Sequence, residues 1–147
     1  MSKPSRHLAR LAAVQALYQW QLTEQAPADI ETHFISDHEL KGVDLEYFHH
    51  LVREVPLHQH ELDDHLLPHL DRSIDEVDPV ERAILRIGSF ELEFQLEIPY
   101  KAVINEAVEL AKTFGAEHGH KYVNAILDKV AFKLRVAETT ARRHENS

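Results

Sequence analysis

Apolar residues along the chain recur at the three- and four-residue spacing of helices that bury one face. In residues 5–21, for example, Leu11, Val14, Leu17 and Tyr18 fall on one stripe. Glycine is scarce, with four in the chain, and alternating runs of β-branched residues are absent. The pattern therefore predicts an all-α protein of about seven helices with no strands.

Capping residues indicate where several of these helices begin and end. Asp44 precedes one apolar stripe, and Asp78 followed by Pro79 is a strong helix start in which Glu81 can complete a capping box. Gly115 suits the position just after a helix. The expected helices begin near residues 5, 29, 44, 57, 79, 101 and 120, the last one ends near residue 136, and the polar stretch from residue 138 is expected to fray.

An acidic, turn-rich stretch at residues 71–78 divides these helices into two groups. We expect one domain over residues 1–147, made of two small packed helical bundles at roughly 1–75 and 76–137 and a polar tail at 138–147. A chain of 147 residues can bury an adequate core without covalent links. Cysteine is absent, which excludes disulfides, zinc-thiolate sites and a cysteine nucleophile.

Charge is distributed unevenly. The net charge is −9, yet residues 1–23 and residues 129–147 each sum to +3, so residues 24–128 carry −15. Lys3, Arg6 and Arg10 are the cations of the first segment, which contains no acid. Such an end can hold a polyanion while the acidic body repels others, although basic termini can also be idle.

The remaining signals argue against a membrane protein and against an enzyme. The start of the chain lacks the apolar run of a signal peptide, and no stretch approaches the ~20 apolar residues of a membrane helix, so a cytoplasmic location is expected. P-loop, nucleophile-elbow and dinucleotide-binding motifs are absent. Carboxylates recur at solvent-facing helix positions, so no catalytic residue is expected.

Twelve histidines raise the question of a metal site. His65 and His69 are four residues apart near Glu61 and Asp64, which is workable ligand spacing, but the other histidines lack a third ligand at motif spacing. We interpret them as surface residues and expect no required metal or cofactor. Asn124 lies within an apolar helix, where a buried hydrogen-bonding role is expected.

Several blocks of sequence resemble one family. The segment Ile98–Lys101 followed by AVINEAVELAKTFGAE and HKYVNAILDKVA resembles the C-terminal signature of the NusB family of bacterial transcription antitermination factors. ARLAAVQALYQW resembles the first helix of that family, and VERAILRIGSFEL resembles its middle helix. These blocks are spread over most of the chain in the expected order.

The resemblance implies an all-α fold of two bundles that binds the boxA element of ribosomal RNA leaders. It also implies a heterodimer with NusE, a protein of the small ribosomal subunit, which joins other Nus factors on RNA polymerase. Glu81 and its helix resemble a region tied to complex assembly. The implied RNA-binding residues are Lys3, Arg6, His7, Arg10, Tyr18, Lys121 and Tyr122.

Several roles stay open from the sequence alone. Arg6 and Arg10, four residues apart, are expected to share an exposed face, which could bind phosphate or be merely solvated. Tyr18 could be a core residue or a stacking platform, and Glu81 could be only a capping residue. The arm is less basic than is usual in the family, with histidine at position 7, and His118 stands where an acid is often found.

Two other functions compete with antitermination. NusB-like domains also occur fused to RNA methyltransferases, but this chain has no room for a cofactor-binding α/β domain, so we expect no free-standing methyltransferase. The second alternative is a protein-interaction helical module with little RNA binding of its own.

Overall fold

A computed structural model describes residues 3–115 and 119–145, with side chains described as far as residue 141. The all-α prediction is confirmed: the described residues form α-helices and two short 3₁₀ helices, and Ser5 and Val43 make their sole β-bridge. The helices are α1 (Arg6–Leu22), α2 (Pro27–Asp37), α3 (Leu45–Leu57), α4 (Gln59–Leu66), η1 (Leu67–His69), η2 (Ile74–Glu76), α5 (Pro79–Phe94), α6 (Tyr100–Phe114), α7 (Gly119–Leu134) and α8 (Val136–Glu145).

Asp44 and Asp78, both predicted to cap helices, are confirmed as the caps of α3 and α5. The Asp44 carboxylate accepts the Tyr47 N–H at 3.0 Å and so begins α3. The Asp78 carboxylate accepts the N–H groups of Val80 and Glu81, both at 3.1 Å, at the start of α5. These bonds satisfy donors that have no partner within the helix, which explains why the helices start at these residues.

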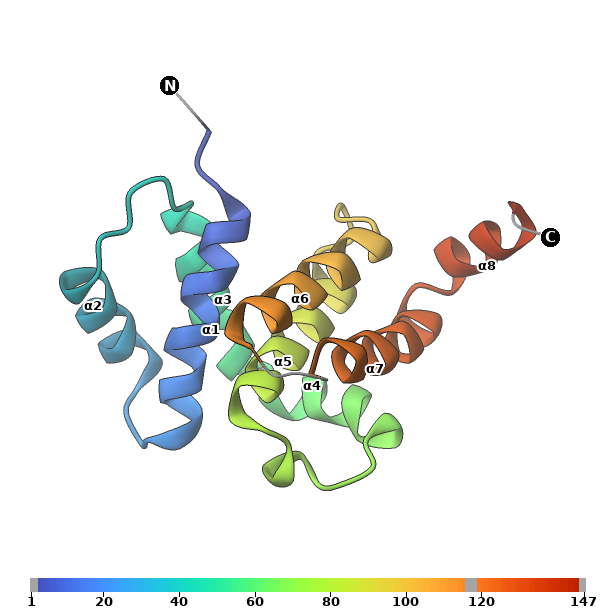
Figure 1. Cartoon of the computed structure of the whole chain (residues 1–147), viewed down its shortest axis with the longest axis horizontal. Helices are drawn as coiled ribbons and strands as arrows, with labels where there is room; N and C mark the ends of the chain where they lie inside the picture. Colours follow the sequence, from blue (N-terminus) through green and yellow to red (C-terminus); the bar gives the residue numbers. More distant parts are fainter. Residues whose placement is uncertain (1–2, 116–118, 146–147) are drawn as a thin grey trace.

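The helices form two packed groups, and α5 contacts both of them (Figure 1). Helices α1, α2 and α3 pack on one another at one side, and α5, α6 and α7 pack on one another at the other. Helix α1 also packs along α5, and α4 lies against α5 and α7. One continuous hydrophobic core therefore runs through both groups, with α5 at its centre.

Helices α5 and α7 approach closely at Gly88. A Cβ atom at this position would lie 2.6 Å from Cδ1 of Leu127, a side chain with no solvent exposure. A larger residue would force Leu127 to shift, so glycine serves close helix packing here and not a positive backbone φ.

The end of the chain differs from the prediction. Helix α7 stops at Leu134, and the segment expected to fray forms α8, so the described residues hold one α-helix more than expected. The buried Arg135 guanidinium holds this junction by donating to the carbonyl oxygens of Leu92 at 2.7 Å and Ile98 at 3.0 Å. The Glu138 carboxylate accepts the Tyr100 N–H at 2.8 Å. These long-range bonds leave no local pattern in the sequence.

Asn124 was expected to be buried between helices, but it is exposed, because the apolar stripe of α7 faces inward on either side of it.

Within the described ranges, none of the helices is both long and apolar enough to cross a membrane.

Candidate nucleic-acid and partner interface

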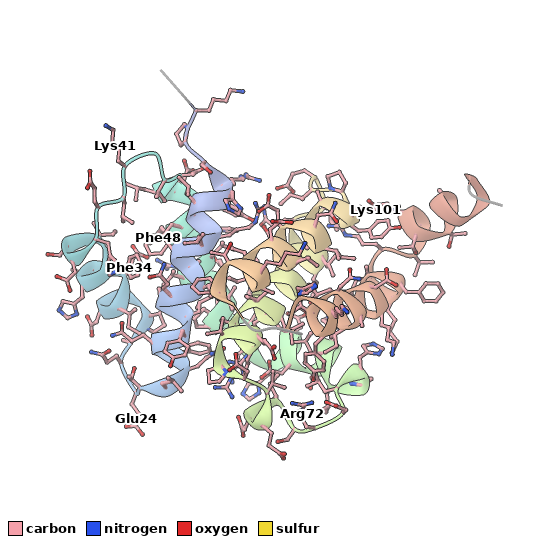
Figure 2. The ribbon with its side chains drawn as sticks, in the orientation of Figure 1. Glu24, Phe34, Lys41, Phe48, Arg72 and Lys101 are labelled. Carbon is pink, nitrogen blue, oxygen red and sulfur yellow. The ribbon has the colours of Figure 1, made fainter. Side chains whose placement is uncertain are left out.

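The segment before α1 is anchored to the loop that precedes α3. The Ser5 hydroxyl caps α1 by accepting the Leu8 N–H at 3.0 Å. The Ser5 backbone N–H donates to the Gly42 carbonyl at 2.8 Å, and its carbonyl accepts the Asp44 N–H at 3.1 Å. Figure 2 shows exposed Lys41, next to Gly42, at the same end of the molecule as the start of α1. Lys41 is a basic residue that the sequence reasoning missed, because only this long-range pairing places it beside the arm.

Arg10 does not share an exposed face with Arg6, so that expectation was wrong. The residue is 5% exposed, and its Nε and Nη2 atoms both lie 2.9 Å from Oε2 of Glu91, which is 1% exposed. The Tyr47 hydroxyl donates to the same carboxylate. Arg10 therefore joins α1 to α3 and α5 inside the protein, where it positions these helices and does not meet solvent.

Two groups of this cluster, Arg10 and Tyr47, have pKa values shifted by their surroundings. Burial lowers the pKa of Arg10, but the charge and hydrogen bonds of Glu91 outweigh it, so the pKa ends above its ordinary value. Burial raises the pKa of Tyr47, and Glu91 raises it further, so the phenol stays protonated. Arg10 therefore stays charged and the Tyr47 phenol stays neutral near neutral pH.

Arg6 remains accessible, with 45% of its side chain exposed. Its guanidinium lies 4.3 Å from the centre of the Tyr47 ring, and its Nη1 atom is 3.8 Å from the Glu97 carboxylate. His7 is half-buried and its Nδ1 atom lies 2.8 Å from Glu106 Oε2. Carboxylates from α6 and from the turn before it thus face the basic arm, although its own segment contains no acid.

Tyr18 is 39% exposed, which favours the surface role over the core role left open by the sequence. It lines an apolar cavity of about 370 Å³ together with Leu22, Phe34 and His38, and this lining does not include Arg6 or Arg10. Tyr18 is therefore not part of the surface around Arg6.

Lys121 and Tyr122 open a second surface at the start of α7. Lys121 is exposed. The Tyr122 hydroxyl donates to Asp71 Oδ1 at 3.2 Å, and the Arg72 guanidinium lies 5.3 Å from the centre of its ring. Burial raises the pKa of Tyr122, with a further contribution from Asp71. The ring is partly covered, so a stacking partner would have to displace Arg72 or share the ring with it.

Glu81 borders this second surface. Burial raises the pKa of its carboxyl, the charge of Asp78 adds to the rise, and Arg72 opposes it. Asp78 caps α5 alone, since the described residues show no hydrogen bond between the Glu81 carboxylate and the first turn. The capping-box reading of Glu81 is therefore wrong, and its carboxylate is left to face Arg72 and Tyr122.

The predicted RNA-binding residues thus form separate surfaces. Figure 2 places Arg72, which covers Tyr122, at the opposite end of the molecule from Lys41. We define the arm surface as Lys3, Arg6, His7 and Lys41, and the α7 surface as Arg72, Glu81, Lys121 and Tyr122. A single RNA strand that touches both has to run across the body of the protein.

The histidines were the candidate metal ligands. In the described ranges no three histidine and carboxylate side chains are grouped so that they could hold a metal ion. The His65 imidazole instead lies 2.7 Å from Glu93 Oε1. His118, singled out for the acid it replaces, lies outside the described residues.

Comparison with known proteins agrees with these features. The model of the NusB family matches residues 7–132. A Nitrosococcus oceani protein named transcription antitermination protein NusB is 59% identical over 137 residues, which cover 93% of this chain and 92% of the relative. A Pasteurella multocida protein of the same name is 52% identical over 126 residues, covering 86% and 88%.

Two solved structures are similar in fold. T. maritima NusB has a TM-score of 0.75 at 30% identity, covering 88% of this chain and 92% of that one. A chain in a crystal structure of the antitermination factors NusB and NusE in complex with dsRNA has a TM-score of 0.76 at 31% identity. The latter covers 86% of this chain and 95% of that one.

Proposed function

Because this chain belongs to the NusB family, we propose that it is a transcription antitermination factor that binds boxA RNA of ribosomal RNA leaders together with NusE. The observation that carries the proposal is the 59% identity to a NusB protein over 93% of the chain. The related structure that holds NusB, NusE and dsRNA together supports both partners. The protein works by binding, without catalysis or a cofactor, in the cytoplasm, and its complex with NusE joins other Nus factors on RNA polymerase.

The arm surface is the proposed first RNA contact. Lys3, Arg6 and Lys41 are exposed cations, and their charges can neutralise phosphates and release counterions. The start of α1 adds the partial positive charge of a helix N-terminus. Arg10 supports this surface only indirectly, since its guanidinium is bound to Glu91.

The α7 surface is the proposed second contact. Lys121 supplies an exposed charge and Tyr122 an aromatic face on which a base can stack. Tyr18, half-exposed on its own face of α1, is a further stacking candidate. We assign Glu81 to partner binding, because its carboxylate makes no cap and lies at the edge of this surface.

A helical module that binds protein but little RNA is the second candidate. The specific observation in its favour is that Glu97 and Glu106 face Arg6 and His7 and oppose an incoming phosphate. In that case NusE would bind normally and RNA would bind only to the complex.

The experiment that tests the proposal is a titration of fluorescent single-stranded boxA RNA with the protein, with and without NusE, at a stated salt concentration. We expect tighter binding to boxA than to a scrambled sequence, and tighter still with NusE. Equal binding of both sequences, with NusE present, would contradict the proposal. Normal NusE binding with boxA binding only by the complex, and none by the protein alone, would favour the second candidate.

A further inference from the structure

A polar cavity of about 210 Å³ lies between the end of α1, α4, η2 and the first turns of α5. Figure 1 shows the end of α1 beside the segment that leads into α5, and Gln21 Nε2 donates to the Pro79 carbonyl at 2.7 Å across this junction. The cavity is partly open to solvent. Its lining consists of Trp20, Gln21, Gln59, Asp75, Arg82 and Arg86.

One of the two arginines is fully compensated. The Arg86 side chain is 4% exposed, and its Nε and Nη2 atoms each donate to Asp63 at 2.9 Å. Its Nη1 atom donates to the Gln21 side-chain oxygen at 3.0 Å, and the guanidinium lies 5.5 Å from the centre of the Trp20 ring. Such a bidentate pair neutralises the guanidinium charge and fixes the orientation of the side chain.

The other arginine is not compensated. Arg82 is 7% exposed, and within the described residues its recorded hydrogen bonds are two long ones of 3.3 Å, from Nη1 to the carbonyl oxygens of Ile74 and Asp75. Its Nε atom is buried and has no partner in the same ranges. A buried donor without a partner is costly, and the cost is greater for a charged group.

The charges around Arg82 also leave its guanidinium without a full counter-charge. Burial lowers the pKa of Arg82, and the neighbouring charge of Arg86 lowers it further. Asp75, Asp63 and Asp78 act in the opposite direction but do not restore the ordinary pKa. Asp75 is exposed, so water screens its charge, and Asp63 is already bound to Arg86.

Two other lining residues offer donors, while the Asp75 carboxylate in the same lining is exposed to water. The Trp20 indole can only donate a hydrogen bond, and the Gln59 amide can donate as well. The first turn of α5, which carries Arg82, adds partial positive charge. A guanidinium with free N–H groups matches the spacing of oxygens on a phosphate.

We propose that this cavity binds a phosphate oxyanion, with Arg82 as its principal ligand. The phosphate can be free inorganic phosphate or a phosphate group of RNA, since both present the same oxygens. The site lies apart from the arm surface and needs neither NusE nor boxA, so it stands independently of the proposed function.

The chain's single tryptophan reports directly on the cavity. We would titrate the full-length protein with inorganic phosphate, keep the ionic strength constant with chloride, and follow the Trp20 indole N–H by nuclear magnetic resonance. We expect a saturable shift, with its midpoint raised at least tenfold in Arg82→Gln and less in Arg82→Lys, which keeps the charge but loses the fork. The control Lys112→Gln, at an exposed lysine paired with Glu109, should titrate like wild type.

Three results would overturn the proposal. The first is no saturable shift in the wild-type protein, and the second is equal midpoints in Arg82→Gln and Lys112→Gln. The third is a midpoint for acetate below that for phosphate, which would indicate a pocket for a carboxylate side chain of a partner. If Arg82→Gln fails to fold, the wild-type comparison of phosphate with acetate and the Arg82→Lys variant still decide. A 5′-phosphorylated and a 5′-hydroxyl oligoribonucleotide, compared by the same signal, distinguish RNA from free phosphate as the source.

Discussion

Arg10 and Glu91, which lie 81 residues apart in the chain, form a buried ion pair that joins α1 to α5. The Arg10 side chain is 6% exposed and that of Glu91 is 1% exposed, so water hardly screens the pair. The pair stands between the two groups of helices and fixes the base of the arm surface.

Arg10→Ala should destabilise the fold, because it leaves the Glu91 carboxylate buried without its counter-charge. Breaking a buried pair in this way costs about 3–5 kcal/mol. Arg6→Ala is the matched control, since its exposed pair with Glu97 is worth at most about 1 kcal/mol. Urea unfolding measures both, and a loss below about 1 kcal/mol for Arg10→Ala would show that the pair is not structural.

Gly88→Ala should also be destabilising, through the contact between α5 and α7. The added methyl group would meet Leu127 at 2.6 Å, and overpacking a core costs about 1–3 kcal/mol. The better helix propensity of alanine offsets up to about 1 kcal/mol of this. Adding Leu127→Val should recover part of the loss in a double-mutant cycle; additive effects would mean that the two residues do not collide.

His69 should make the protein less stable in mild acid. Burial lowers the pKa of His69 below 6.5, and Lys133 and Lys129 lower it further. The unfolded chain therefore binds this proton more readily than the folded chain, so stability is lost as the pH falls from about 6.5 towards the lowered value. In a resonance titration, Lys133→Gln should raise the His69 pKa without restoring it to 6.5. An unchanged pKa would remove Lys133 as a cause.

Glu81→Lys should weaken NusE binding while the fold is kept. The change reverses a charge beside Arg72 and near a helix N-terminus, so we also expect a loss of stability of about 0.3–1 kcal/mol. Calorimetry of NusE binding tests the role, with Glu109→Lys, an exposed site on α6, as the matched control. Unchanged affinity in the folded Glu81 variant would remove this residue from the partner interface.

Local signals predicted most of the fold. Helix starts at Asp44 and Asp78 could be read because capping bonds span only two or three residues. The end of the chain could not, since α8 is joined to the body through Arg135 and carbonyls some 40 residues away. The division of the domain near residues 71–78 stays a prediction.

The candidate site was harder to predict, for a physical reason. Arg6 and Arg10 look alike in the sequence, at one helical turn from each other, but the fold brings Glu91 to one and leaves the other at the surface. Lys41 reaches the arm only through the pairing of Ser5 with Gly42 and Asp44. The local count of acids in residues 1–23 therefore overstated how free the basic arm is.

We propose that the arm surface binds the phosphates of boxA RNA. The most direct measurement is the salt dependence of boxA affinity, in the presence of NusE, for the double variant Lys3→Ala with Arg6→Ala. Removing two phosphate contacts should reduce the slope of log K against log salt by about 1.4, at ~0.7 per contact with single-stranded RNA. The exposed pair Lys112→Ala with Lys133→Ala, which removes the same charge elsewhere, should leave the slope unchanged. A wild-type affinity and slope in the Lys3 and Arg6 variant would contradict the account.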